Sequence, residues 1–312
     1  MTKWLITGGA GFIGSHVVEQ LVRRGDSVRV LDMLLHGDKT SADIRGDVEL
    51  VHVDVRDPSA VENAVKGCDA VIHLAAYIGV EFVASHAAAT MEVETLGTLN
   101  VLNAMRKHDV SHIVYASTSA VYGHHHVDEP VAENFAVAPV SGYAIAKRSN
   151  EIFLKANYKD YGISSASIRF FNVYGPRQDE RMVIPRFFRQ ALRHEPITVF
   201  GSGSQTRDFT YIEDTADIIV DLGDLGQGCH IVNIVRGAEV SVRDLAFHIV
   251  NLVQGDSQVV FMEPPVGRLD FEVSRRWGSS DKLFDLIGKR PKIDVAKGLN
   301  KYFDWMRDHP QA

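Results

Sequence analysis

The sequence has little cysteine, no long apolar run and no concentration of basic charge. Cys68 and Cys229 are the only cysteines in 312 residues, which argues against a disulfide framework or a cysteine-rich zinc site. No apolar stretch reaches bilayer-spanning length, and the formal net charge of −7 argues against nucleic acid as the main partner. An apolar segment that begins at residue 3 leaves no room for a signal peptide, so we expect a cytoplasmic protein without a membrane partner.

What the sequence does contain, close to its start, is a glycine-rich turn between a strand and a helix. The segment KWLIT predicts a buried strand, GGAGFIG follows it, and SHVVEQLVRR predicts an amphipathic helix. Gly8 lets the chain turn sharply, Gly11 lets a pyrophosphate approach the backbone, and Gly14 lets the helix pack close to the sheet. The N-terminus of that helix faces negative charge favourably. This context predicts a dinucleotide site, although a glycine-rich turn without a nucleotide is the alternative.

The identity of the dinucleotide is predicted from Asp32, which ends the next expected strand. Its carboxylate lies about 20 residues beyond the glycine turn, where it can accept hydrogen bonds from the adenosine ribose. The same charge would repel a 2′-phosphate, and positions 33–35 hold no arginine to bind one. We therefore expect NAD rather than NADP.

Strand and helix patterns alternate through the first half of the chain. This alternation predicts an α/β fold with a Rossmann doubly wound parallel sheet and a smaller α/β substrate-binding domain. We expect an NAD-binding domain over 1–172, with a further strand near 231–235, and a discontinuous substrate-binding region over 173–312. The helix at 86–108 is expected to turn an inner face toward the core, made of Met91, Leu96, Leu99, Leu102 and Met105.

A candidate for proton transfer is the pair Tyr143 and Lys147, four residues apart on one face of a predicted helix. A free tyrosine is a poor base at neutral pH, but a nearby ammonium favours the phenolate. Tyr143 could then take a proton from a substrate hydroxyl. Ser117 and Thr118 follow another predicted strand, where a hydroxyl could bind the reacting oxygen; a polar turn is the alternative.

Together these segments resemble the extended short-chain dehydrogenase/reductase family, in its nucleotide-sugar epimerase and dehydratase branch. The resemblance covers nearly the whole chain and implies catalytic roles for Thr118, Tyr143 and Lys147. Ser119-Ala120 replaces the Asp-Glu of the dehydratases, and Ala120 replaces a glutamate common in the decarboxylases. The cofactor-binding residues that it implies are Gly8, Gly11, Phe12, Ile13, Gly14, Asp32, Asp54, Val55, Leu74, Ala75, Ala76, Ser117, Tyr143, Lys147 and Phe171.

The resemblance also implies a pocket for a nucleotide diphosphate in the second half of the chain. Its expected substrate-binding residues are Thr118, Asn172, Val183, Ile184, Arg207 and Arg268. A planar guanidinium suits a phosphate, although Arg207 could instead pair with Asp208 or Glu213. Arg177, Arg181 and Arg186 could meet a hexuronate carboxylate, bind phosphate or lie on the surface.

The expected function is an NAD-dependent C4 epimerase acting on a nucleotide sugar, a UDP-hexose or UDP-hexuronate. A reductase, dehydrogenase or decarboxylase on the same scaffold, and a non-catalytic sensor, remain alternatives. One position departs from the family, because Glu94 replaces the asparagine that usually precedes Gly97-Thr98. We expect a homodimer built on the helices at 86–108 and 143–161.

Two other features are discounted. Three consecutive histidines at 124–126 cannot all face one ion from a regular element, so no metal site is expected. Arg275-Arg276-Trp277 is interpreted as a surface or lid segment rather than a nucleic-acid contact.

Overall fold

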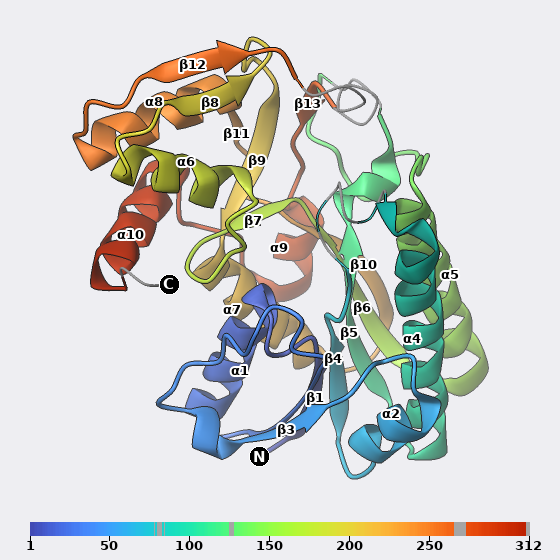
Figure 1. Ribbon diagram of the computed structural model, residues 1–312. Coiled ribbons are helices and arrows are strands. Elements are labelled where there is room, and N and C mark those ends of the chain that lie inside the picture. The colour runs from blue at the N-terminus through green and yellow to red at the C-terminus, as the bar shows by residue number, and fades with distance from the viewer. Residues whose placement is uncertain (78, 80–82, 84, 125–127, 265–272, 310–312) are drawn as a thin grey trace. The chain divides into compact units, whose positions relative to one another are not determined.

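The computed structural model describes the chain except for residues 78, 80–82, 84, 125–127, 265–272 and 310–312 (Figure 1). The chain divides into two compact units. The first unit is Met1–Val121, Val137–Phe170 and Thr215–Val232, and the second is Tyr122–Ala136, Phe171–Asp214 and Asn233–Ala312. The domain boundary expected at residue 172 stays a prediction.

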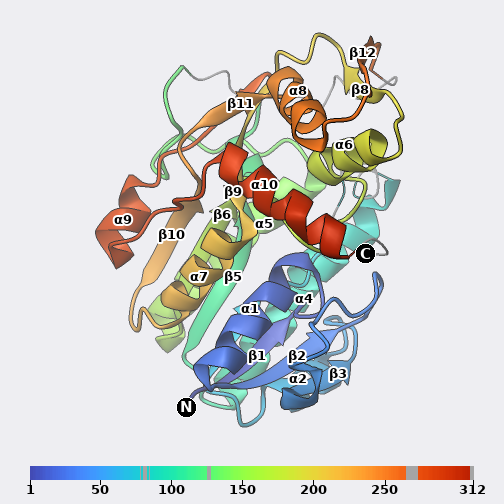
Figure 2. The same cartoon turned by 90° about the vertical axis from the view of Figure 1, so that its left-hand side faces the viewer.

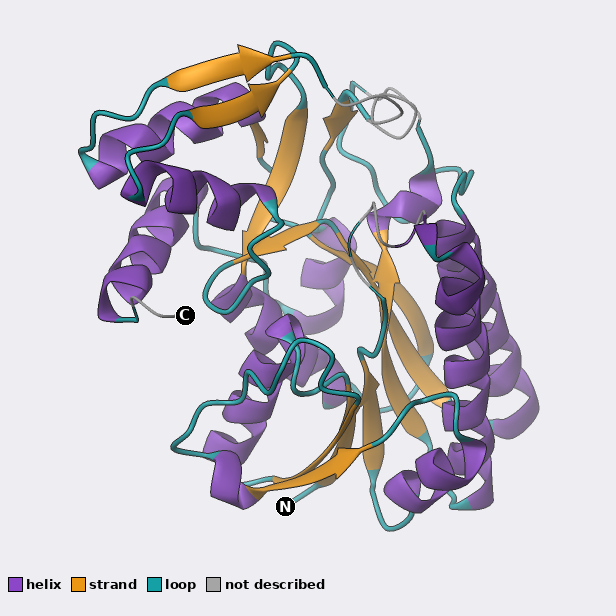
Figure 3. Ribbon diagram, viewed as in Figure 1, coloured by secondary structure: helices purple, strands orange, loops and turns teal. Residues whose placement is uncertain are grey.

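The first unit is built on a seven-stranded sheet with the order β10-β6-β5-β4-β1-β2-β3. The neighbouring pairs from β3 to β6 are parallel, and helices lie on both faces (Figure 3). The predicted α/β Rossmann fold is therefore confirmed. The strands are β1 (Lys3–Thr7), β2 (Ser27–Asp32), β3 (Val48–His52), β4 (Ala70–His73), β5 (His112–Thr118), β6 (Ser164–Phe170) and β10 (Cys229–Ile234). The helices are α1 (Phe12–Arg24), α2 (Pro58–Val65), α4 (Ala87–Lys107), α5 (Gly142–Tyr161) and α7 (Ile212–Gly223).

Local capping explains where the helices of this unit start and stop. Helix α2 begins after Asp57, whose carboxylate accepts hydrogen bonds from Ser59 N and Ala60 N. Helix α5 begins after Ser141, whose hydroxyl accepts from Ala144 N at 3.2 Å. It ends at Gly162, which adopts a left-handed φ of 72°. These caps fix the start of α5 one residue before Tyr143.

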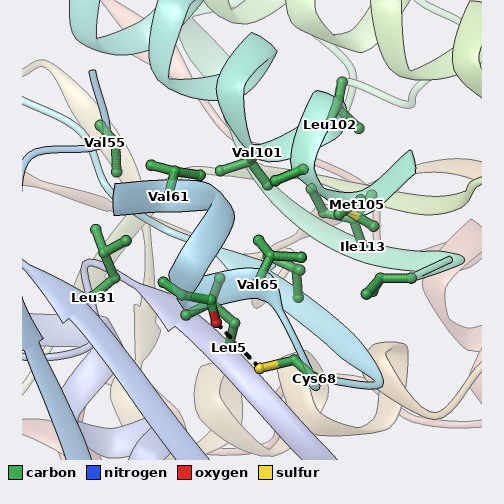
Figure 4. Packing of buried hydrophobic residues seen from close by; sticks show 14 of the residues in the cluster. Leu5, Leu31, Val55, Val61, Val65, Cys68, Val101, Leu102, Met105 and Ile113 are labelled. Carbon is green, nitrogen blue, oxygen red and sulfur yellow. Dashed lines mark hydrogen bonds between the residues drawn. The ribbon is translucent and has the colours of Figure 1, made fainter. Parts of the chain in front are cut away.

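The core between the sheet and helices α2 and α4 is mostly aliphatic (Figure 4). Leu5 and Ile113 from the strands meet Val65 from α2 and Met105 from α4, all of them fully buried. Cys68 lies at its margin, and its thiol donates a 3.4 Å hydrogen bond to the carbonyl of Ala64. This packing presses α2 and α4 onto one face of the sheet, while α1 and α7 lie on the other (Figures 1 and 2).

The expected inner face of α4 is wrong at two positions. Leu102 and Met105 are buried, but Leu96 and Leu99 are 47% and 36% exposed. The buried face instead continues through residues with shorter or polar side chains, namely Thr90, Val93, Glu94, Gly97, Thr98 and Val101. This face packs closely on the segment between β3 and α2, where a Cβ at Gly97 would approach Val55 Cγ2 to 2.8 Å.

The second unit contains two small sheets. In one, β9 is flanked by β11 and β13 and also pairs with β7; in the other, β12 pairs with β8. Its strands are β7 (Asn172–Tyr174), β8 (Ile197–Phe200), β9 (Thr206–Tyr211), β11 (Glu239–Ser241), β12 (Val259–Met262) and β13 (Arg275–Arg276). Its helices are α6 (Val183–Leu192), α8 (Val242–Val253), α9 (Asp281–Ile287) and α10 (Val295–Asp308). Among the residues that the structure describes, no helix is long and apolar enough to cross a membrane.

Candidate active site

The glycine turn forms a cradle that only glycines can build. A Cβ at Gly8, where φ is +71°, would lie 2.7 Å from Ala75 N, and a Cβ at Gly14 would lie 2.2 Å from the Gly8 carbonyl oxygen. At Gly11, by contrast, a Cβ would meet only that same oxygen, at 3.2 Å, within 4 Å. Gly11 therefore faces open space among the described residues, as a site for pyrophosphate requires.

Helix α1 presents its N-terminus at this cradle. Its N-cap, Gly11, supplies no side-chain hydrogen bond, and the first turn contains no acidic residue, so the helix dipole favours an anion there. Phe12 and Ile13, the first two residues of the helix, are partly exposed.

Asp32 stands at the end of β2 beside the same turn. Its carboxylate accepts from Ala10 N at 3.1 Å and Leu34 N at 2.8 Å. Burial raises the pKa of Asp32, while these two backbone hydrogen bonds oppose that change. A carboxylate has about four acceptor positions, so acceptor capacity remains for a diol such as a ribose.

Two further segments expected to contact the cofactor lie at strand ends of the same sheet. Asp54 follows β3 and accepts a hydrogen bond from Arg56, whose Nη2 lies 2.6 Å from Asp54 Oδ2. Val55 is buried against α4. Leu74, Ala75 and Ala76 follow β4 and are partly exposed. The residues present therefore fit a bound dinucleotide at the carboxyl edge of this sheet.

The three expected catalytic residues come from β5 and α5 of the first unit. Thr118 ends β5, and its hydroxyl accepts from Ala120 N at 3.2 Å. Tyr143 is half-buried near the start of α5, and Lys147 Nζ lies 5.6 Å from the centre of its ring. Thr118 also forms a hydrogen bond with the Tyr143 side chain. The structure thus brings together a hydroxyl, a phenol and an ammonium.

Neighbouring buried polar groups hold this arrangement in place. Ser117 is turned away from it, because its hydroxyl donates to Glu151 Oε1 at 2.7 Å. Glu151 also accepts two 2.8 Å hydrogen bonds from Arg169. This buried network joins the end of β5 to α5 and β6, so the strand end and the helix that carries Tyr143 are held in register.

The charge beside Tyr143 is unexpected. Lys147 Nζ lies 2.7 Å from Glu94 Oε2, and both side chains are 1% exposed. The pKa of Tyr143 is raised, first by burial and then by the negative charge of Glu94, while the hydrogen bond with Thr118 opposes the change. With its pKa raised above the ordinary value, Tyr143 is a neutral phenol near pH 7.

Apart from Thr118, the described residues expected to bind the substrate lie in the second unit, and so does Phe171, which is expected to contact the cofactor. Phe171 packs on Gly278, where a Cβ would lie 2.8 Å from its ring. Asn172, on β7, donates to the carbonyl of Asp208 on β9 at 3.4 Å. Arg207 Nη1 donates to the backbone carbonyls of Thr206 and Val273, both at 2.7 Å. These contacts fix the direction of the Arg207 side chain.

Asp208 was one alternative partner for Arg207. Its buried carboxylate accepts from Arg236 N and Gly237 N at 3.0 Å, and from Gly278 N at 3.4 Å. Successive residues of a strand point to opposite faces, so Asp208 and Arg207 diverge from β9. Burial raises the pKa of Asp208 to about 6, although the three backbone donors oppose that change.

Arg276 is the functional candidate that sequence reasoning missed. The segment expected to be a surface or lid segment is a strand, in which Arg276 pairs in register with Arg207 of β9. Arg276 Nη2 donates to the carbonyl of Gly123 at 2.5 Å. Burial and then the charge of Arg207 lower its pKa to about 10. Two partly buried guanidinium groups side by side favour a bound dianion.

The remaining predicted residues differ in their placement. Ile184 in α6 is 1% exposed, so only its backbone could meet a ligand, whereas Val183 is partly exposed. Arg268 lies outside the described residues. His125 and His126 do so as well, and within the described part of the chain no cluster of three or more histidines, cysteines or carboxylates could hold a metal ion.

The fold and the first unit's site define an enzyme class: a Rossmann protein with a dinucleotide cradle and a tyrosine–lysine pair. The chain belongs to the NAD dependent epimerase/dehydratase family, whose model matches residues 4–234. The resemblance predicted from the sequence is thereby confirmed, and NAD is confirmed as the cofactor of the family.

Comparison with individual proteins shows which activities accompany this scaffold. A relative from Methanocaldococcus jannaschii, provisionally named a UDP-glucose 4-epimerase, is 37% identical over 310 residues, covering 98% of each chain. A UDP-N-acetyl-alpha-D-glucosaminuronate decarboxylase from Bacillus cytotoxicus is 33% identical over 318 residues, again covering 98% of each. The solved UDP-glucose 4-epimerase of Thermus thermophilus, in complex with NAD, superposes with a TM-score of 0.88 at 32% identity, covering 98% of this chain and 99% of that one. The chain is thus similar to both epimerases and decarboxylases of nucleotide sugars.

Proposed function

We propose that this chain is an NAD-dependent nucleotide-sugar C4 epimerase acting on a UDP-hexose or UDP-hexuronate. The observation that carries the proposal is the arrangement of Thr118, Tyr143 and Lys147, with Ser119-Ala120 directly after Thr118. Neither of these two residues can act as a general acid or base toward C5 or C6 of the sugar. The machinery present suits proton transfer at one hydroxyl and no elimination of water.

The chain's own groups divide the work at C4. When bound, NAD supplies the hydride acceptor and donor that inversion at this carbon needs. In its phenolate form, Tyr143 removes the proton from the C4 hydroxyl and later returns it. Thr118, held by Ala120 N, directs its hydroxyl at the same oxygen. Lys147 places its ammonium group beside Tyr143. Asp32 and the glycine cradle bind the cofactor.

We assign anion binding to the second unit. Arg207 and Arg276 lie side by side on β9 and β13, and their planar guanidinium groups suit the diphosphate of a nucleotide sugar. Strong retention of the diphosphate would allow a 4-keto sugar to rotate between its two faces without escaping.

A nucleotide-sugar decarboxylase is the second candidate. The 33% identity with the decarboxylase of Bacillus cytotoxicus favours it. Against it stands Ala120, at the position where the decarboxylases often have glutamate.

The deciding experiment is NMR of the purified protein with UDP-glucose, UDP-glucuronate and UDP-N-acetylglucosamine separately, without added cofactor. Inversion at C4 of one of them would support the epimerase and identify its substrate. Consumption of a sugar only when NAD or NADH is supplied would contradict it in favour of a net redox enzyme, and loss of carbon dioxide would favour the decarboxylase. No reaction in any mixture would favour a sensor.

The homodimer is a proposal as well, and the exposed apolar residues of the first unit support it. Helices α4 and α5 lie beside each other (Figure 1) and expose large apolar side chains to solvent. These side chains are Leu96, Leu99, Ile145, Ile152 and Phe153. Such a patch suits a second copy of the chain. Sedimentation velocity of the wild type should show a dimer and that of Ile152→Glu a monomer; a wild-type monomer at all concentrations would contradict the proposal.

A further inference from the structure

Glu94, in the middle of α4, forms a buried ion pair with Lys147 of α5. Its Oε2 lies 2.7 Å from Lys147 Nζ, and each side chain is 1% exposed. The family resemblance leads us to expect asparagine at this position, so the carboxylate is a departure made by this chain. Lys147 is four residues from Tyr143 and faces it, so the departure bears directly on the proposed base.

Lys147 and Glu94 share one proton, and the pair has no net charge wherever that proton lies. If the proton is on Lys147, a cation faces an anion; if the proton moves to Glu94, both groups are neutral. An ammonium beside a phenol helps to form phenolate only to the extent that its charge is not balanced by another group. Glu94 supplies that balance at 2.7 Å, which is hydrogen-bond distance.

No other titratable group that faces the pair offsets this effect. Tyr115 on β5 lies with its ring centre 4.9 Å from Lys147 Nζ, and burial raises the pKa of its hydroxyl well above the ordinary value. His73 on β4 is fully buried, and burial followed by the charge of Lys147 lowers its pKa to about 3. Both groups are therefore neutral near pH 7. Arg148 and Glu151 of the same helix are charged as well, but they pair with each other at 2.8 Å, and Glu151 also pairs with Arg169.

The carboxylate of Glu94 depends on Lys147 for its stability. Glu94 Oε1 is buried without a hydrogen-bond partner among the described residues. Its backbone carbonyl is occupied by Thr98 Oγ1 at 2.7 Å and Asn150 Nδ2 at 2.8 Å, which holds this turn of α4 against α5. Burial raises the pKa of Glu94 and the contact with Lys147 opposes that rise. The ion pair with Glu94 therefore holds the Lys147 ammonium toward α4.

We propose that Glu94 is a positioning residue that holds the Lys147 ammonium and balances its charge, so that Tyr143 stays a neutral phenol in the free protein. The inference rests on the proposed function, since it deepens the role given to Tyr143 as the base. Its consequence is an activity profile displaced to higher pH than the same scaffold would show with a neutral residue at position 94.

The test is a spectroscopic pH titration of Tyr143, which requires no turnover. The ultraviolet difference absorbance of tyrosinate is recorded for the full chain, and the same curve for Tyr143→Phe is subtracted to remove the other eight of the nine tyrosines. The subtraction is repeated in the Glu94→Gln and Glu94→Asn backgrounds. Both neutral replacements should move the midpoint of Tyr143 down by about 1–2 pH units, as expected when an ammonium within a few ångströms is no longer balanced.

Two further variants separate a charge effect from a structural one. Glu94→Asp keeps the charge and should retain most of the high midpoint. Glu92→Gln removes a charge from the same helix, but from a 54% exposed side chain that pairs with Arg56, and should leave the midpoint unchanged. Far-ultraviolet circular dichroism establishes that each variant is folded.

The outcomes distinguish this inference from the proposed function. Equal midpoints in wild type, Glu94→Gln and Glu94→Asn would overturn the role of Glu94, even if NMR shows C4 inversion. A lowered midpoint would support it, even if NMR shows a different reaction. Should the neutral variants not fold, the wild-type titration still tests the inference, because a Tyr143 midpoint below that of free tyrosine contradicts it.

Discussion

The two units handle buried charge in opposite ways. In the first unit, the buried Lys147 and Arg169 each meet a buried carboxylate, from Glu94 and Glu151 respectively. In the second unit, Arg276 donates to a backbone carbonyl and lies beside another guanidinium, that of Arg207. The first unit thus balances these buried charges internally, whereas the second places two positive groups side by side, an arrangement that favours an anion.

The difference extends to their buried acids. Glu151 of the first unit receives two guanidinium hydrogen bonds from Arg169, whereas Asp208 of the second receives only weaker backbone donors from Arg236, Gly237 and Gly278. Accordingly, the pKa of Glu151 is lowered although burial, the largest influence, opposes the change, while that of Asp208 is raised by burial to about 6. The comparison teaches that the hydrogen-bond donors at a carboxylate, as well as its burial, decide the direction in which its pKa shifts.

The largest expected effect comes from removing the phenol of the first unit. Tyr143→Phe should lower kcat by about 10²- to 10⁴-fold, because it deletes the group that moves the proton. Binding of a nucleotide diphosphate should be unaffected, because that task is assigned to the second unit. Steady-state kinetics and calorimetry measure the two quantities. Tyr158→Phe, a change at an exposed tyrosine of the same helix, is the control. Retention of full activity by Tyr143→Phe would rule out the assignment of the base.

The positions of the candidate site residues of the first unit could be predicted from sequence because these residues lie in short contiguous segments. Gly8 to Gly14 and Tyr143 with Lys147 are set by local turns and by helical spacing, and the structure places them at a strand end and on α5 as that spacing implies. The ion pair between Glu94 and Lys147 could not be predicted, since it depends on how α4 packs against α5. Arg276 was missed for a similar reason: its register with Arg207 joins residues almost seventy positions apart, and nothing local records it.

The exposure of Leu96 and Leu99 shows a further limit. An apolar stripe at helical spacing predicts a buried face, but it does not reveal whether the core of the same chain or another surface covers it. On α4 the side facing the core is built from small residues such as Gly97, where a Cβ would contact Val55. The leucines lie on the opposite side of the helix.

The next largest effect should come from the glycine cradle. Gly14→Ala places a methyl group 2.2 Å from the Gly8 carbonyl oxygen, so the backbone must shift. We expect NAD binding to weaken by about 2–3 kcal/mol, roughly 30- to 150-fold. Gly46→Ala, where a Cβ meets nothing within 4 Å, is the matched control. Titration calorimetry with NAD measures both; equal affinities would show that the cradle does not hold the cofactor.

A smaller effect is expected from the second unit. Arg276→Leu should raise KM for the nucleotide sugar by about 10- to 30-fold, corresponding to the loss of one charged hydrogen bond of about 1.5–2 kcal/mol, with a much smaller change in kcat. Arg207→Leu should act in the same direction. Arg243→Leu, which alters a 54% exposed arginine of the same unit, should change nothing. If the Arg276 variant lowers kcat and leaves KM unchanged, the division of labour between the units is wrong.

The smallest effect concerns stability and should have opposite sign in the two units. His73 has a folded pKa of about 3, below its unfolded value of 6.5, so its contribution is present above pH 6.5 and is lost as the pH falls toward 3. Asp208 has a folded pKa of about 6, above its unfolded value of 3.8, so its contribution is present below pH 3.8 and is lost as the pH rises through 6. Between pH 7 and pH 5, acidification should therefore cost the first unit about 1–2 kcal/mol through His73 and stabilise the second by a similar amount through Asp208.

Urea unfolding of His73→Gln and Asp208→Asn at both pH values measures each contribution as a difference from wild type. Relative to wild type, the His73 variant should become less sensitive to acid and the Asp208 variant more so, and changes of the same sign would contradict the contrast between the units.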